Sequence, residues 1–300
     1  MELKQLSGAS IKLMIRYPWS HITIDFLKKN NIDIEYLLSQ QALIDKAKKR
    51  VIKILEKKKA SHQTEESFEE VYVYYITLIL VTATESFYLA RLISTFEQKR
   101  AFNYLKDEDN IVLVNIARNT FGWDISHGLF KINETAYEFR IHFINYLDGS
   151  RNINDKYWQL VNKLIKEGYV YLSKKEIARL LSEKVREKVF EKITKTKIKR
   201  IPAQLETAVK EIKEIIEKTE MKFYSEKKIK RKSSDIFPPC MRYILNKIKK
   251  GENLPHIARF AITSFLLNAG FSVDDVIDIW RLSPDFDEDI ARYQVEHIAG

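Results

Sequence analysis

The stretch Pro-Pro-Cys-Met-Arg at 238–242 organises the C-terminal part of this sequence. Proline is disfavoured in the interior of a helix, but it is favoured in the first turn, where its missing N–H needs no partner. We therefore expect a helix from these prolines to about Lys250, closed by Gly251 in the left-handed conformation. Cys240 would lie at the start of that helix, where free N–H groups and the helix dipole favour its thiolate.

Three further short helices are expected after this one. Proline, serine and glycine at their ends predict helices over 255–270 and 273–282. A fourth is predicted from residue 284, with Ser283 as its N-cap and acidic residues in its first turn. The segment 235–300 is thus predicted to form a small, all-helical C-terminal unit.

Several side chains of this unit are predicted to share a site. Residues three or four apart lie on one helical face, which pairs His256 with Arg259 and Tyr293 with His297. The guanidinium of Arg259 is a planar, always charged fork suited to phosphate, and Arg242 offers the same chemistry one turn into its own helix. The histidines can donate to phosphate oxygens, and Tyr293 can stack on a base or donate its hydroxyl.

Other interpretations remain open for the same residues. His256 and His297 could be ordinary interior histidines, and Cys240 could be a small buried hydrophobe. His256, Arg259, Tyr293 and His297 could also be acid–base groups of a stand-alone enzyme or a small-molecule binder. Template binding without turnover by the isolated chain would separate a binding subunit from such an enzyme.

The composition narrows the class of protein. Its 300 residues allow one large domain or two ordinary ones, and 45% hydrophobic residues supply a sizeable core. The net charge of +10 favours a polyanionic partner. A single cysteine excludes an internal disulfide framework and fits a reducing compartment. The most apolar run, 71–83, is shorter than the roughly 20 residues of a membrane span, and the N-terminus has no apolar signal-peptide core. No membrane association is expected.

Helical periodicity dominates the chain before the C-terminal unit. Long helices are expected there, over 34–59, 67–105, 176–195 and 202–218. The β-branched content of 71–83 also allows a strand. The runs 111–116 and 137–143 predict strands of a small inserted sheet, after which helices resume near Asn154. The predicted fold class is therefore mainly α, with a helical N-terminal domain over 1–218 that contains a small inserted β-sheet.

Residues 219–234 predict a basic linker, because lysine and arginine outnumber the acids there and periodicity is weak. This linker is either a solvated tether or a tether that also touches nucleic-acid phosphates. The predicted domains are an N-terminal domain at 1–218, the linker at 219–234 and the C-terminal domain at 235–300.

No catalytic constellation is visible in the sequence. There is no glycine-rich phosphate loop, and the six histidines lack metal-ligand spacing. Two-metal nucleotidyl transfer needs paired carboxylates on one face of a rigid strand. Asp107 and Asp109 are instead predicted in a loop, and Asp285 and Asp287 in the first turn of a helix, where capping explains them. We expect no catalytic residues in this chain.

Three motifs in order carry a family resemblance: Pro-Pro-Cys-Met-Arg at 238–242, Leu-Pro-His-x-x-Arg-Phe at 254–260 and Tyr-x-x-x-His-x-x-Gly at 293–300. Together they resemble the C-terminal domain of the archaeal and eukaryotic DNA primase large (regulatory) subunit, and the likeness is looser over the first 215 residues. That family holds a [4Fe–4S] cluster through four cysteines, of which Cys240 matches the first. The other three would follow the last motif, and the chain stops at Gly300. We therefore expect no stable cluster in the chain as given.

The resemblance also implies partners and a process. It implies a heterodimer in which the N-terminal domain docks a small catalytic primase subunit. The C-terminal unit would engage the single-stranded DNA template, the initiating nucleotide and the RNA primer during DNA replication. A member of this family would be cytoplasmic or nucleoid-associated, or nuclear in a eukaryote.

Overall fold

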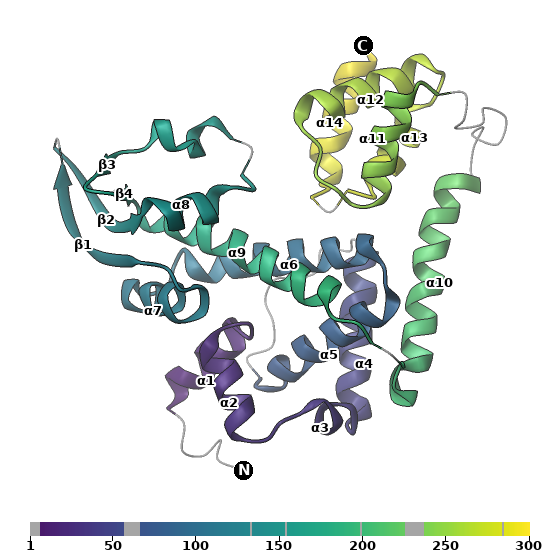
Figure 1. The fold of residues 1–300 in the computed structure, drawn as a ribbon. Coiled ribbons are helices and arrows are strands. Elements are labelled where there is room, and N and C mark those ends of the chain that lie inside the picture. The colour runs from purple at the N-terminus through teal and green to yellow at the C-terminus, as the bar shows by residue number, and fades with distance from the viewer. Residues whose placement is uncertain are drawn as a thin grey trace.

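The computed structural model describes residues 7–56, 67–132, 134–153, 155–198, 200–225, 237–283 and 285–300. The N-terminal body contains ten helices in the described residues: α1 (Gly8–Arg16), α2 (His21–Lys29), α3 (Ile34–Leu38), α4 (Gln41–Leu55), α5 (Glu69–Thr84), α6 (Phe87–Leu105), α7 (Asn110–Phe121), α8 (Phe143–Ser150), α9 (Lys174–Lys195) and α10 (Ala203–Ser225). A small sheet lies between α7 and α9, at the opposite end of the body from α10 (Figure 1). The prediction of a mainly α fold with an inserted sheet is confirmed.

Helix α5 is the centre of the N-terminal core. Its apolar run 71–83 is buried almost throughout, so the helix meets protein on every side. The strand alternative for this run is therefore wrong. The predicted single helix over 67–105 is also wrong, because Glu85 takes a left-handed conformation with φ of 58°. The hydroxyl of Ser86 then caps a new helix, α6, by accepting from the N–H of Leu89 at 3.2 Å.

The sheet is antiparallel, with strand order β1-β2-β4-β3. Its strands are β1 (Ile125–Ile132), β2 (Thr135–His142), β3 (Ile165–Lys166) and β4 (Tyr169–Leu172). The predicted strand at 137–143 is confirmed in β2, where alternate residues Phe139 and Ile141 are buried. The predicted strand at 111–116 is wrong, since these residues form part of α7. Leu113, Ile116 and Ala117 bury one helical face there, and a short apolar run does not distinguish a strand from a buried helix.

Two other boundaries differ from the predictions. The predicted helix over 34–59 is two helices, α3 and α4, with Ser39 and Gln40 between them. Helices were expected to resume near Asn154, but α8 begins directly after β2 at Phe143. The segment after α8 forms two 3-10 turns, at Lys156–Trp158 and Leu160–Asn162, before β3 and β4. This segment is tied to α8, because the hydroxyl of Tyr146 donates to the carbonyl of Trp158 at 2.9 Å.

The predicted helices at 176–195 and 202–218 correspond to α9 and α10. Helix α10 continues to Ser225, so the first seven residues of the predicted linker are helical. Residues 226–236 of that linker lie outside the described part of the chain. Helix α9 begins with a capping box, in which Ser173 and Glu176 bond to each other's backbone N–H.

We expect Glu176→Gln to lower the free energy of unfolding by about 1–3 kcal/mol at neutral pH. The Glu176 carboxylate accepts hydrogen bonds from Lys163 and Tyr157, each at 2.7 Å, and from the N–H of Ser173 at 2.8 Å. Burial raises the pKa of Glu176, but these donors outweigh it and hold the pKa below its usual 4.5. Because the pKa of Glu176 is lower in the folded state than in the unfolded chain, the ionised carboxylate stabilises the fold at pH values above the unfolded-state pKa. This contribution is lost as the pH falls through the folded-state pKa.

Urea unfolding at neutral pH and at about pH 3 measures this difference. The gap between wild type and Glu176→Gln should shrink at the lower pH, since both side chains are then neutral in the unfolded chain. Glu191→Gln is the matched control, because Glu191 pairs with Lys195 on the exposed side of the same helix. Equal losses in the two variants would contradict the special role of Glu176.

Over the described residues 237–283 and 285–300, the C-terminal unit packs four helices around a small apolar core. They are α11 (Pro239–Lys249), α12 (His256–Asn268), α13 (Val273–Trp280) and α14 (Glu288–Ala299). The first three correspond to predicted helices, and Gly251 and Gly270 follow α11 and α12 with φ of 65° and 88°. The predicted start of the fourth helix is wrong, because α14 begins at Glu288 with Asp287 as its N-cap. Ser283 bonds instead to Asp285, while Pro284 lies outside the described residues.

The C-terminal unit lies above α6 and α9 of the N-terminal body (Figure 1). The loop after α11 approaches these two helices, and a cavity of about 360 Å³ there is lined by residues such as Arg91, Arg186, Phe190 and Asn253. In the described ranges, none of the helices combines the length and the apolar character needed to cross a bilayer.

Candidate functional site

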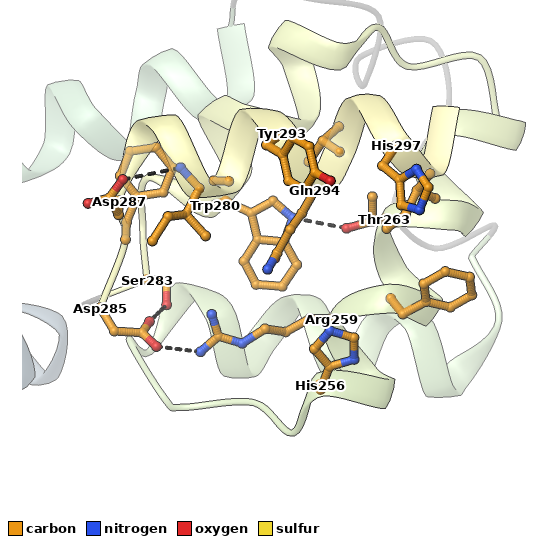
Figure 2. A pocket seen from close by; sticks show the side chains of 16 residues that line it. His256, Arg259, Thr263, Trp280, Ser283, Asp285, Asp287, Tyr293, Gln294 and His297 are labelled. Atoms are coloured by element: carbon orange, nitrogen blue, oxygen red, sulfur yellow. Dashed lines mark hydrogen bonds and ion pairs between the residues drawn. The ribbon is translucent and has the colours of Figure 1, made fainter. Parts of the chain in front are cut away.

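A cavity with a volume of about 410 Å³ lies within the C-terminal unit. Its walls are formed by α12, by α14 and by the loop that follows α13 (Figure 2). His256 and Arg259 of α12 face it from one side, and Tyr293 and His297 of α14 from the other. The structure therefore brings together four of the residues that the sequence singled out, from two helices whose first residues, His256 and Glu288, are 32 positions apart in the chain.

Arg259 is held in a fixed orientation at the edge of this pocket. Its Nε donates to the carbonyl of Leu254 at 3.1 Å, and its Nη2 donates to Oδ2 of Asp285 at 2.6 Å. Its guanidinium carbon also lies 5.5 Å from the ring centroid of Trp280, within cation–π range. The indole Nε1 of Trp280 donates in turn to Thr263 at 3.0 Å, which fixes the ring beside the arginine.

The sequence did not reveal the role of Asp285 in this pocket. Instead of lying in a helix's first turn, it accepts from Arg259 and from the hydroxyl of Ser283. Burial raises the pKa of Asp285, but the Ser283 hydroxyl and the Arg259 guanidinium outweigh it, so the pKa is lowered from 3.8. Asp285 is therefore ionised at neutral pH and ties the loop after α13 to α12.

The α14 side of the pocket is aromatic. The rings of Tyr293 and His297 are nearly parallel, with an interplanar angle of 13° and centroids 6.3 Å apart. Tyr293 is 72% exposed, and two apolar side chains that line the same pocket, Ile290 of α14 and Phe260 of α12, are also exposed. Such a surface offers a flat face on which a planar ring can stack.

The exposure of these residues removes two of the alternative interpretations. His256 and His297 are both exposed, so they are not interior histidines. Cys240 is an exposed free thiol at the start of α11, so it is not a buried hydrophobe. Cys240 and Arg242 both lie on α11 and are not among the residues that line the pocket.

The residues present do not fit a [4Fe–4S] cluster. A four-iron cluster takes four cysteine thiolates, or three with a substitute ligand. The chain has one cysteine, Cys240. Within the ranges that the structure describes, no group of three or more histidine, cysteine, aspartate or glutamate residues is arranged to hold a metal ion.

The fold and this pocket define a class: a mainly α protein with an inserted antiparallel sheet and an arginine-, histidine- and aromatic-lined pocket in a separate C-terminal unit. The family model of the eukaryotic and archaeal DNA primase large subunit N-terminal domain matches residues 15–202. The model of the C-terminal domain of the same subunit matches residues 230–300. The chain belongs to the eukaryotic and archaeal DNA primase large subunit family.

Individual relatives agree with this assignment. The chain is 34% identical to the DNA primase large subunit PriL of Methanocella arvoryzae over 95% of its own length and 76% of the relative's. It is 34% identical to PriL of Methanococcoides burtonii, covering 95% and 79% of the two chains. The corresponding protein of Halobacterium salinarum is 27% identical, with 95% and 81% covered.

Proposed function

We propose that this chain is the non-catalytic regulatory subunit of a DNA primase. Its N-terminal body docks a small catalytic subunit, and its C-terminal pocket binds the phosphates and bases of the initiating nucleotide, template and RNA primer. The observation that carries the proposal is the convergence of Arg259 and His256 with the stacked Tyr293 and His297 around one cavity. The net charge of +10 supports a nucleic-acid partner.

The pocket supplies the two kinds of contact that a nucleotide needs. Among the described residues the Nη1 group of Arg259 makes no hydrogen bond, so this end of the fork is available to phosphate oxygens. His256 on the same helix provides a second donor. Tyr293 and His297 provide the stacking face. A hydrogen bond to a charged group contributes about 1.5–3 kcal/mol and a stacked base about 1–3 kcal/mol, so affinity for a single nucleotide should be modest.

The acidic residues support a non-catalytic role. Asp285 is paired with Arg259, and Asp287 caps α14 by accepting from the N–H of Asp289 and of Ile290. Asp109 is the N-cap residue of α7, with Asp107 in the turn before it. Neither pair stands on a strand, where a two-metal site would hold its carboxylates rigidly.

The face of α8 is the surface on which we place the catalytic partner. Phe143, Ile144 and Leu147 lie on one side of this short helix and are all exposed. The neighbouring segment adds the exposed Tyr157 and Val161. Exposed apolar side chains gathered on joined segments mark protein interaction surfaces.

We expect Ile144→Asp to weaken binding of the catalytic subunit at least about tenfold, because a charge at the centre of an apolar interface removes a hot spot of roughly 2 kcal/mol or more. Co-purification with the catalytic subunit measures the loss of binding. Primer synthesis on a single-stranded template measures the effect of that loss on activity. The chain alone should make no primers, whereas the complex should initiate more often than the catalytic subunit alone.

The control is Ile111→Asp, which changes an equally exposed isoleucine on α7. This variant should bind the partner as the wild type does. Primer synthesis by the isolated chain would overturn the proposed function. Loss of the partner from Ile111→Asp but not from Ile144→Asp would place the interface elsewhere on the body.

Cys240 also bears on the iron–sulfur cluster that the family resemblance implies. We propose that the chain as given carries no stable [4Fe–4S] cluster, because Cys240 supplies one of the four thiolates such a centre takes. Iron and acid-labile sulfide, measured on anaerobically purified protein, should each be far below one equivalent per chain. Stoichiometric iron and sulfide would contradict this expectation and require ligands from outside these residues.

A further inference from the structure

The ion pair between Arg259 and Asp285 poses a problem for the proposed function. Arg259 is the pocket's cation, yet a carboxylate oxygen already lies 2.6 Å from its Nη2. Asp285 is not a chance neighbour, because the hydroxyl of Ser283 holds its other oxygen. An incoming phosphate therefore meets a cation whose charge is largely compensated within the protein.

Arg259 does not need Asp285 to keep its orientation. The carbonyl of Leu254 accepts from Nε at 3.1 Å, and the Trp280 ring lies against the guanidinium. These two contacts come from the residue just before the N-cap of α12 and from α13, and they remain if the carboxylate is removed. The main consequence of Asp285 is thus electrostatic: it places a negative charge beside the group that would receive a phosphate.

We propose that Asp285 is a built-in competitor for the nucleotide phosphate, an internal counter-ion that lowers the affinity of the pocket for the 5′-phosphates of nucleotides. The inference rests on the proposed function of the pocket. Binding of a phosphate at Arg259 weakens or replaces the Arg259–Asp285 pair. It thereby loosens the loop between α13 and α14. A moderate affinity allows the subunit to hold a nucleotide during initiation and to release it afterwards.

The competition should depend on the charge of the ligand. A carboxylate repels a ligand in proportion to the ligand's negative charge, so its removal should favour a triphosphate more than a monophosphate. Both partners of the pair are partly exposed, at 28% and 36%, so solvent screens the interaction and limits the gain. We expect a gain of about three- to tenfold in affinity for a nucleoside triphosphate.

Asp285→Asn is the decisive variant, because asparagine keeps the size and the acceptor oxygen but removes the charge. Its affinity for GTP and GMP, measured by calorimetry with the complex of both subunits at low salt, should exceed that of the wild type, with the larger gain for GTP. Asp287→Asn is the matched control. Asp287 also lines the pocket, but it caps α14, a role that asparagine fills equally well. Its gain should be clearly smaller.

The outcomes separate the inference from the function on which it rests. Wild-type binding with equal or weaker binding by Asp285→Asn overturns the inference and leaves the proposed function standing. Equal gains in Asp285→Asn and Asp287→Asn also overturn it, since a general charge effect would then suffice. Absence of binding in every variant overturns both. If Asp285→Asn does not fold, Ser283→Ala loosens the anchor of Asp285 and should give a smaller gain, and no gain there overturns the inference.

Discussion

Replacing Glu97 with glutamine should destabilise the N-terminal body by about 3–5 kcal/mol, because it leaves the buried Arg100 without its carboxylate. Arg100 is 1% exposed and Glu97 is 2% exposed, in the middle of α6. Nη1 of Arg100 donates to Glu97 at 3.2 Å, and Nη2 donates to the carbonyl of Ile15 at 2.7 Å. Arg50 of α4 bonds to the other oxygen of Glu97. The Glu97 carboxylate thus joins α4 to α6, and Arg100 extends the network to α1.

The size of the effect follows from what remains after the substitution. A buried ion pair contributes little net stability, since desolvation of the charges offsets their attraction. Removal of one partner has no such compensation: Arg100 cannot lose its proton and cannot reach water from its buried position. Glutamine keeps the shape of Glu97, so packing changes contribute little to the measured difference.

Urea unfolding followed by circular dichroism measures the change in stability. Glu70→Gln is the control, since Glu70 pairs with the same Arg50 at 3.2 Å but nearer the surface. It should cost about 1 kcal/mol or less. The double variant Glu97→Met with Arg100→Met should recover much of the loss, because neither charge is then buried. A loss below about 1 kcal/mol for Glu97→Gln would show that water reaches the network.

The local signals of the sequence predicted the C-terminal helices well. The prolines at 238–239 and the glycines at 251 and 270 act on the backbone within a few residues, and Ser272 forms a capping box with Asp275. The same local reasoning failed at Ser283. A serine followed by proline and acids is typical of a helix start, but Asp285 is bound by Arg259, 26 positions earlier. No local pattern contains that contact.

The sheet shows the same limit. Strand β2 was predicted because it has one buried and one exposed face, which produces alternation. Strand β1 lies at the sheet edge with one buried residue and no alternation of buried and exposed side chains, so no burial pattern marks it. For the pocket, spacing along α12 and α14 predicted each pair of site residues. Trp280 and Asp285 were missed because only the packing of α13 and its following loop brings them there.

The substitution Arg259→Ala should weaken binding of a primer that carries a 5′-triphosphate by about 10- to 100-fold in the reconstituted complex, the equivalent of one or two charge-assisted hydrogen bonds. The loss of affinity should exceed the contribution of the arginine's own hydrogen bonds to phosphate. In the variant, Asp285 remains in the pocket without its partner and repels the phosphate. Arg259→Lys should recover only part of the affinity, because an ammonium lacks the planar fork that bonds Leu254 through Nε while its other nitrogens face the phosphate.

Arg242→Ala is the matched control for this experiment. Arg242 is an exposed arginine of the same unit, but it lies on α11 outside the pocket. Its loss should weaken every template alike and reduce the salt dependence of binding by about one counter-ion. Arg259→Ala should instead affect the triphosphorylated primer far more than a primer with a 5′-hydroxyl. Equal sensitivity of the two primers would mean that Arg259 binds the chain's backbone phosphates and that the pocket does not recognise the 5′ end.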